Sequence, residues 1–255
     1  MAFKMIHPSP KYQLTTSVIF DLALAWVFVQ HRSFTNHALR LLPGIHPPLR
    51  VWGKDNIPCA GPGVITVNHY WSPTFWAPWI AIALSAIVPV DIYWTMTDAF
   101  TYPSRRFARY RRAVSHILLT RIARVYAFNT MPPMPPAPGE APERAASVKR
   151  LLEYVRQNPS ALVGLAPEGY DRPGGVLDLP PQGAGRLALA LSRLGLYFIP
   201  VGAFEESGEF CLCFGKPYRL EVPRSDDRMQ VDLFVREMLT REVARCLPQR
   251  LRGGF

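Results

Sequence analysis

The chain has 255 residues, enough to bury a sizeable core in one α/β domain or in two small ones. Hydrophobic residues make up 49% of it and charged residues 19%, a composition too apolar for a disordered chain. The 29 lysines and arginines outnumber the 19 acidic residues, and this excess suits nucleic acid, an anionic membrane surface or a phosphate-bearing substrate.

The first apolar stretch, residues 14–30, predicts a helix that lies in a membrane interface or inserts shallowly. It contains Asp21 and is shorter than the about 20 residues that a spanning helix needs. Trp26 and the basic residues around the stretch are typical of an interfacial position. A second apolar run, 75–90, contains two prolines, and we interpret it as a buried or membrane-dipping helix. The apolar N-terminal region and the lack of a recognised nucleic-acid-binding module argue against nucleic acid as the partner.

From residue 50 onward, short β-branched runs alternate with amphipathic stretches, which predicts an α/β fold with a sheet flanked by helices. The expected strands are 63–68, 90–95, 124–128, 161–166, 197–201, 209–214 and 218–222. The last two are expected to form a hairpin through the turn 215–217. The expected helices include 147–158, 183–195 and a segment around 231–238. The proline-rich segment 129–142 predicts an extended surface loop or lid.

Polar residues follow the first expected buried strand, 63–67. Asn68, His69 and Ser72 come where the chain leaves this strand, and open α/β sheets bind ligands at the carboxyl edge of their strands. A histidine there can take a proton from a substrate hydroxyl near neutral pH. The alternative is a histidine that only satisfies local hydrogen bonds.

A second polar segment, 166–175, follows the apolar strand 161–165. Glu168 stands between Pro167 and Gly169, and Asp171 and Arg172 come next. A carboxylate and a guanidinium at the end of a strand can hold a polyol and a phosphate. The alternative is an ordinary proline–glycine turn with a surface ion pair.

The four cysteines contain no Cys-x-x-Cys pair, so a zinc site or a redox motif is not expected. We interpret Cys59, Cys211, Cys213 and Cys246 as reduced packing residues of a cytosolic protein. No metal and no cofactor are expected.

Taken in order, three segments resemble the glycerol-phosphate and lysophosphatidate acyltransferase superfamily. NHYWSPT from Asn68 is similar to the family's motif of Asn-His, four residues and Asp, and APEGYDR from Ala166 is similar to its Phe-Pro-Glu-Gly-Thr-Arg-Ser motif. FIPV at 198–201 matches its strand with a Val/Ile-Pro-Val triplet. The resemblance covers roughly residues 48–225 and implies the acyltransferase fold, a mixed sheet flanked by helices. It divides the chain into an apolar interfacial segment 1–47, the acyltransferase domain 48–225 and a C-terminal helix in 226–255 that packs on this domain.

The resemblance also implies roles for single residues. In that family the motif histidine is the general base, and it deprotonates the acceptor hydroxyl that attacks the thioester of acyl-CoA or acyl-carrier protein. Carried over, His69 is the base and Thr74 occupies the position of the aspartate that orients it. The residues expected to bind substrate are Asn68, Ser72, Glu168, Gly169 and Arg172, and of these Glu168 and Gly169 fall in the acceptor site of the family. The implied partners are an acyl thioester donor, a lysophospholipid or glycerol-phosphate acceptor and the anionic cytoplasmic face of a membrane.

The sequence departs from the family pattern at three places. Thr74 removes the charge partner of the histidine, and Asp91 and Asp98 are candidate replacements. Arg172 is displaced by one position, and Asn129 or Thr130 stands where the second motif has arginine. For that missing arginine, Arg121 and Arg124 are the candidate substitutes. These departures keep open an alternative function, a non-catalytic member of the fold that binds a lipid or an acyl chain.

Overall fold

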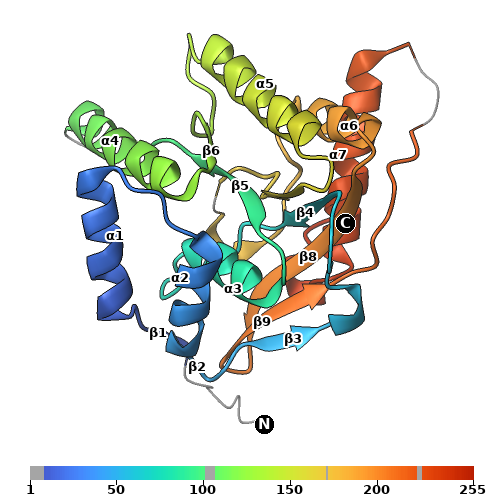
Figure 1. Ribbon diagram of the computed structural model, residues 1–255. Coiled ribbons are helices and arrows are strands. Elements are labelled where there is room, and N and C mark those ends of the chain that lie inside the picture. The colour runs from blue at the N-terminus through green and yellow to red at the C-terminus, as the bar shows by residue number, and fades with distance from the viewer. Residues whose placement is uncertain (1–8, 101–106, 171, 223–225) are drawn as a thin grey trace.

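The structure is a computed structural model that describes residues 9–100, 107–170, 172–222 and 226–255. It confirms the α/β class. In the described residues, seven strands form one sheet in the order β3-β9-β8-β4-β7-β5-β6. Their bounds are β3 Arg50–Trp52, β4 Gly63–Val67, β5 Ile92–Thr97, β6 Asn129–Met131, β7 Leu162–Leu165, β8 Tyr197–Glu206 and β9 Glu209–Phe214. Strands β8, β4, β7, β5 and β6 run parallel, while β9 is antiparallel to β8 and parallel to β3 (Figure 1).

Helices cover both faces of this sheet, and every residue of the central strand β4 is buried. Alternate residues of β4 enter two cores: Ile65 and Val67 pack with Trp79 of α3, whereas Val64 packs with Leu151 of α5. The helices are α1 Thr16–Phe28, α2 Phe34–Leu41, α3 Pro78–Ile87, α4 Ala108–Tyr126, α5 Ala141–Gln157, α6 Ala184–Arg193 and α7 Arg228–Ala244. Short 3₁₀ helices span Leu42–Gly44, Lys54–Asn56, Pro173–Gly175 and Gln249–Leu251. The second apolar run is the buried helix α3, as one of its two interpretations expects.

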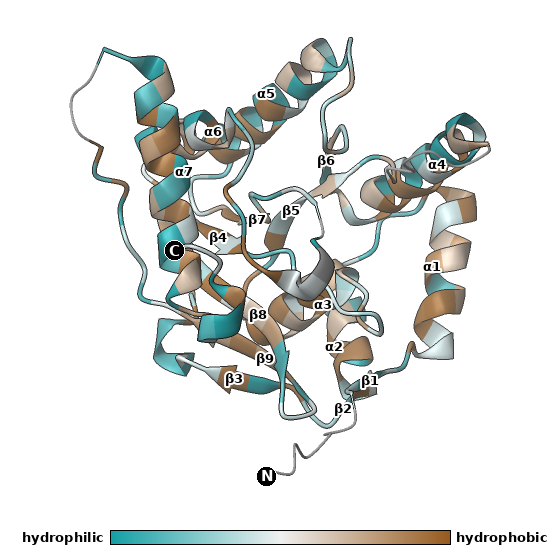
Figure 2. Ribbon diagram, turned by 180° about the vertical axis from the view of Figure 1, so that it is seen from behind, coloured by the Kyte–Doolittle hydropathy of each residue, from teal (hydrophilic) through white to brown (hydrophobic). Residues whose placement is uncertain are grey.

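The apolar N-terminal stretch forms α1, which lies beside α4 at one end of the molecule (Figures 1 and 2). The charge of Asp21 within this apolar helix has partners. Its carboxylate accepts from the Arg32 guanidinium at 3.1 Å and lies 2.7 Å from His37 Nε2 of α2. The other ring nitrogen of His37 lies 2.8 Å from the Tyr126 hydroxyl of α4. The hydrogen bond from His37 lowers the pKa of Asp21. None of the described helices has both the length and the apolar character to cross a membrane.

The N-terminal segment also forms a two-stranded antiparallel sheet with a later part of the chain. Strand β1, Lys11–Tyr12, pairs with β2, Ile45–His46. The Tyr12 ring packs on Phe75, Trp79 and Phe210, with ring centroids 5.3, 5.5 and 6.0 Å apart. This segment therefore covers part of the main core.

Two expected strands are wrong. Residues 124–128 contain the end of α4, and the strand begins after them at Asn129. The 19 residues of α4 contain no glycine or proline, so nothing interrupts the helix before Ala127, which ends it at φ 55°. The proline-rich segment that follows holds β6 first and a loop only after it.

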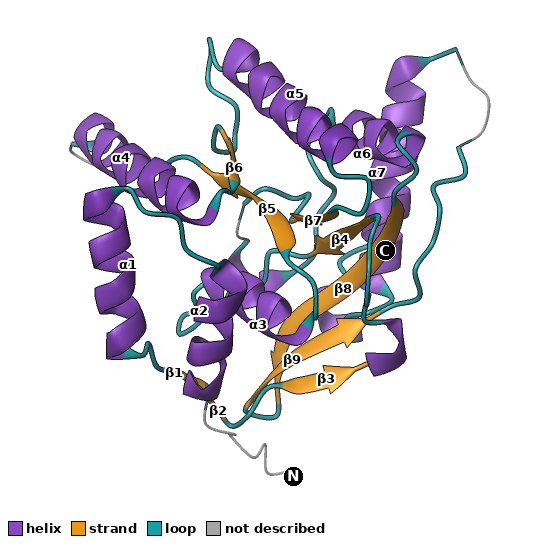
Figure 3. Cartoon of the chain, viewed as in Figure 1, coloured by secondary structure: helices purple, strands orange, loops and turns teal. Residues whose placement is uncertain are grey.

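The expected hairpin of 209–214 with 218–222 is also wrong. β9 pairs instead with β8, to which it is joined by Ser207 and Gly208 (Figure 3). Both of these turn residues have positive φ, 52° and 80°, as a tight two-residue hairpin requires. Tyr218 then forms a single bridge with Phe198 on the other side of β8. The C-terminal helix α7 packs against α6 and β8, while the domain limits 47 and 225 stay predictions.

Candidate functional site

The two polar segments meet at the carboxyl ends of the neighbouring parallel strands β4 and β7, as expected. The backbone N–H of His69 donates to Glu168 Oε2 at 2.6 Å. The backbone N–H of Asp178 donates to the other oxygen, Oε1, at 2.8 Å. One carboxylate near the start of the loop after β7 therefore binds both the loop after β4 and a later part of its own loop.

Glu168 has only 5% of its surface exposed. Burial raises its pKa, while the two backbone N–H groups act in the opposite direction because they stabilise the carboxylate. Its oxygens hold the backbone of the site together, a role that the sequence did not predict. An acceptor hydroxyl would share these oxygens with the backbone, so the acceptor contact of Glu168 stays a prediction.

Gly169 has the conformation that the Pro-Glu-Gly turn needs. Its φ is 74°, in the left-handed region that favours glycine. Its N–H donates to the Ala166 carbonyl at 3.1 Å, and a Cβ added to it would lie 2.9 Å from the Met134 side chain. The glycine thus lets the turn pack under the loop that follows β6.

The Asn68 side chain extends the sheet, and its contact with a substrate stays a prediction. Its side-chain Nδ2 donates to the Ala203 carbonyl at 2.9 Å, and its Oδ1 accepts from the Ala203 N–H at 2.7 Å. The side chain is buried and continues the β4–β8 ladder beyond Val67. Because both polar atoms are engaged, Asn68 fixes the point where the chain leaves the sheet just before His69.

Ser72 lies in the same loop, and its hydroxyl donates to Glu205 Oε2 at 2.8 Å. The Tyr70 hydroxyl donates to the same oxygen at 3.2 Å, and the Tyr12 hydroxyl donates to Oε1 at 2.6 Å. Glu205 is not among the residues expected from the sequence; it stands near the carboxyl end of β8, four residues after the FIPV segment. Its place at the same edge as His69 is the signal that could have found it.

Thr74 is exposed in a turn closed by the Phe75 N–H and the Ser72 carbonyl at 3.1 Å. No described residue forms a hydrogen bond with its side chain. Asp91 precedes β5 and so lies at the opposite end of the strands from His69. Asp98 follows β5 at the same edge, with its Oδ2 3.8 Å from His116 Nδ1, and burial raises its pKa.

Arg172 lies on the loop after β7, half exposed. Its guanidinium contacts the Asp178 carboxylate and donates to the Tyr170 hydroxyl at 3.3 Å. That hydroxyl in turn donates to Asp178 Oδ2 at 2.6 Å, and this bond raises the pKa of Tyr170. Asp171, which belongs to the same motif, lies outside the described residues. The three side chains form a charged rim beside the Glu168 turn.

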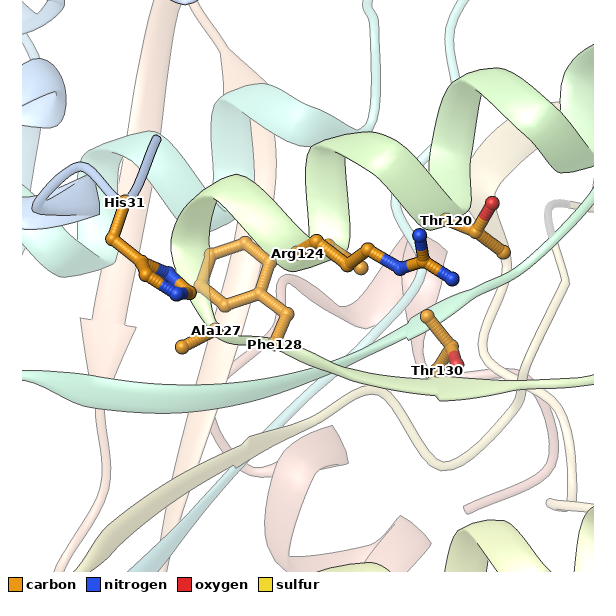
Figure 4. Close-up of a pocket in the computed structure, with 7 residues that line it drawn as sticks. His31, Thr120, Arg124, Ala127, Phe128 and Thr130 are labelled. Atoms are coloured by element: carbon orange, nitrogen blue, oxygen red, sulfur yellow. The ribbon is translucent and has the colours of Figure 1, made fainter. Parts of the chain in front are cut away.

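Neither Arg121 nor Arg124 takes the place of the missing second-motif arginine beside His69. Asn129 is buried, and its Nδ2 donates to the Ser147 hydroxyl at 3.2 Å. Arg121 donates to the Trp26 carbonyl of α1 at 3.1 Å. Arg124 lines an open cavity of about 340 Å³ with His31, Thr120, Ala123, Ala127, Phe128 and Thr130 (Figure 4). This cavity borders β6, three strand spacings from β4, or roughly 14 Å.

The site contains one half-buried histidine, His69. Its loop is held by Glu168 through the backbone and by Glu205 through two side-chain hydroxyls. The imidazole can accept and return a proton at the carboxyl edge of the sheet. The described residues contain no group of three or more histidine, cysteine or acidic side chains that could hold a metal ion.

Of the comparisons with known proteins, the one with solved structures gives a match. No protein-family model matches the chain, and a search of curated proteins finds no match. Among solved structures, the chain is similar to the 1-acyl-sn-glycerophosphate (LPA) acyltransferase PlsC from Thermotoga maritima. The sequence identity is 14% and the TM-score 0.49, and the match covers 90% of this chain and 87% of that one.

Proposed function

We propose that the protein transfers a fatty acyl group from a thioester donor to the hydroxyl of a lysophospholipid or glycerol-phosphate acceptor. The observation that carries the proposal is the hydrogen bond from the His69 N–H to Glu168, which joins the two motif segments at one edge of the sheet. Residue order alone does not bring the two motif segments together, and an acyltransfer site needs them to be adjacent in space.

His69 acts as the general base of this reaction. Its imidazole takes the proton of the acceptor hydroxyl as the oxygen attacks the thioester carbonyl, and the carbon–sulfur bond then breaks. The proton passes to the leaving thiolate, so the products are an ester and a free thiol. The donor, acyl-CoA or acyl-carrier protein, is a substrate, and the reaction needs no cofactor.

A free-thiol assay tests this function directly. Purified protein is incubated with acyl-CoA or acyl-carrier protein and a panel of lysophospholipids and glycerol phosphate. We expect thiol release that depends on the acceptor, with the ester product seen by mass spectrometry. Thiol release at the same rate without any acceptor would indicate a thioesterase and contradict acyl transfer.

The alternative function is binding of a lipid or acyl chain without catalysis. Two observations favour it: the exposed position of Thr74 and the engagement of Arg121 with α1 rather than with the site. A binding protein would retain lysophospholipid or acyl-CoA in an equilibrium assay and release no thiol.

The variant Thr74→Asp separates the two functions. A carboxylate five residues after His69 would stabilise the imidazolium that forms in the transition state, so an enzyme is expected to gain about ten-fold in initial rate. The measurement is free-thiol release with the best acceptor of the panel.

Ser160→Asp is the matched control, because it adds the same charge at an exposed turn before β7, at the opposite end of the strands. Its rate should equal that of the unmodified protein. A lower rate for Thr74→Asp would mean that another group already serves His69, and no thiol release from any form would favour the binding protein.

The proposed second partner is an anionic membrane surface, contacted by α1 and α4 on the cytoplasmic side. The exposed large apolar residues of these helices are Ile19, Phe20, Leu24, Val27, Phe28, Tyr110, Val114, Ile117 and Leu118. Helix α4 adds five arginines and no acidic residue. Exposed apolar and aromatic side chains together with arginines are typical of helices that lie in a membrane interface.

Phe20 and Phe28, each 65% exposed on α1, are expected to insert into the bilayer. Burying a phenylalanine contributes about 1.5–3 kcal/mol, so Phe20→Asp with Phe28→Asp should weaken vesicle binding by at least about ten-fold. Flotation with phosphatidylglycerol vesicles measures this, and binding should weaken as salt rises. The control Met229→Asp with Leu233→Asp changes exposed residues of α7 and should bind normally. Equal binding by both double variants would place the contact elsewhere.

A further inference from the structure

The loop that carries His69 is held by two carboxylates from two different strands. Glu168, after β7, accepts from the His69 backbone N–H at 2.6 Å. Glu205, near the end of β8, accepts from the hydroxyls of Tyr70 and Ser72, the residues one and three positions further along the loop. His69 is thus fixed at its own backbone and at two of the next three residues.

The Tyr70 side chain is tightly packed. It is buried, and its ring lies against Gly175, where an added Cβ would be 2.9 Å from the ring. Burial and the charge of Glu205 raise the pKa of Tyr70 to about 12, so its hydroxyl stays protonated and donates. Because Tyr70 directly follows His69, the bond between its hydroxyl and Glu205 limits how far the backbone beside His69 can move.

Glu205 is itself anchored. It belongs to β8, whose hydrogen bonds to β9 continue through Glu206. The guanidinium of Arg250 donates to the Glu205 carbonyl at 2.7 Å and to Glu206 Oε1 at 3.0 Å. A strand end fixed in this way can hold a loop in one position.

We propose that Glu205 is a positioning residue for His69, acting through the hydroxyls of Tyr70 and Ser72. In the family that the sequence resembles, an aspartate within the histidine loop orients the base; here that position is Thr74, and the carboxylate that holds the loop comes from β8. The proposal rests on the proposed acyl transfer for its catalytic meaning, while the hold of Glu205 on the loop can be tested without catalysis.

The catalytic test compares the three hydroxyls that reach Glu205. Glu205→Gln removes the charge and one acceptor oxygen and should lower kcat about 10- to 100-fold with little change in KM, because a misplaced base affects the chemical step. Ser72→Ala and Tyr70→Phe should lower kcat in the same direction. Tyr12→Phe is the matched control: it keeps the ring and removes only the hydroxyl that donates to the other carboxylate oxygen, Oε1, so it should leave kcat unchanged.

A double variant checks that the effect runs through one path. Glu205→Gln with Ser72→Ala should be no slower than Glu205→Gln alone, since both changes break the same contact. A merely structural role would give additive losses and would make Tyr12→Phe as harmful as Ser72→Ala. Either result, or a kcat of Glu205→Gln within two-fold of the unmodified protein, would overturn the proposal.

Amide hydrogen exchange provides the measurement that does not depend on activity. Peptides that cover residues 69–75 should exchange faster in Glu205→Gln than in Tyr12→Phe, while peptides of β4 should not change. If the unmodified protein releases no thiol but this difference is seen, the proposed function fails and the hold on the loop stands. If exchange of 69–75 is the same in both variants, Glu205 does not position the loop, whatever the activity.

Discussion

Replacing His69 with alanine is expected to lower acyl transfer by about 10²- to 10⁴-fold, the usual contribution of a positioned general base. The fold should persist, because the N–H that donates to Glu168 belongs to the backbone and is kept in the alanine variant. The measurement is the initial rate of thiol release, together with a thermal unfolding curve that verifies the fold. Retention of more than about a tenth of the activity would remove His69 from the role of base.

His31→Ala is the informative control for this experiment. His31 is exposed and lines the cavity beside Arg124 (Figure 4). This cavity borders β6, three strands along the sheet from β4. Its loss should leave the rate unchanged. A large effect of His31→Ala with a small effect of His69→Ala would move the chemistry to that cavity.

Glu168→Ala is expected to destabilise the protein as well as inactivate it. The change leaves two backbone N–H groups, of His69 and Asp178, without their acceptor, and each unsatisfied buried group costs about 1–3 kcal/mol. A loss of about 3 kcal/mol corresponds to a fall in Tm of roughly 6–12 °C for a chain of this size. Acyl transfer should fall with it, since the loop of His69 loses one of its two anchors. Calorimetry and the thiol assay measure the two effects.

Two further variants serve as comparisons for Glu168→Ala. Glu168→Gln keeps one acceptor oxygen but turns an amide NH₂ toward the other N–H. Its stability should therefore lie between that of the unmodified protein and that of Glu168→Ala. Glu209→Ala removes a carboxylate that pairs with Arg50 at 2.9 Å on the surface, and such pairs contribute about 0–1 kcal/mol. If Glu168→Ala unfolds no earlier than Glu209→Ala, Glu168 does not hold the two loops together.

The sequence predicted the part of the site that depends on local patterns. The apolar runs that became β4 and β7 are buried on both faces, so their composition alone identifies them as central strands. His69 and Glu168 follow these strands directly, and neighbouring parallel strands bring their carboxyl ends together. Their adjacency could therefore be expected before any contact was known.

The remaining parts depend on contacts between distant residues. Asn68 and Ser72 were expected to meet substrate, but their polar atoms are engaged by Ala203 and Glu205, more than 130 positions away. No local pattern reports such a pairing. The misplaced strand at 124–128 has another cause, since a five-residue apolar run is compatible with the end of a helix as well as with a strand.

The position of strand β1 limits how far the N-terminus can be truncated to obtain a more soluble protein. Cutting away the apolar helix α1 with everything before it would also remove Tyr12, whose ring covers Phe75 and Phe210. Phe75 ends the turn that begins at Ser72, so the trimmed chain would expose an aromatic surface next to the loop that carries His69. Replacing the exposed apolar side chains of α1 with polar ones is a better route to a more soluble version than truncation, because the segment before the helix packs on the main core.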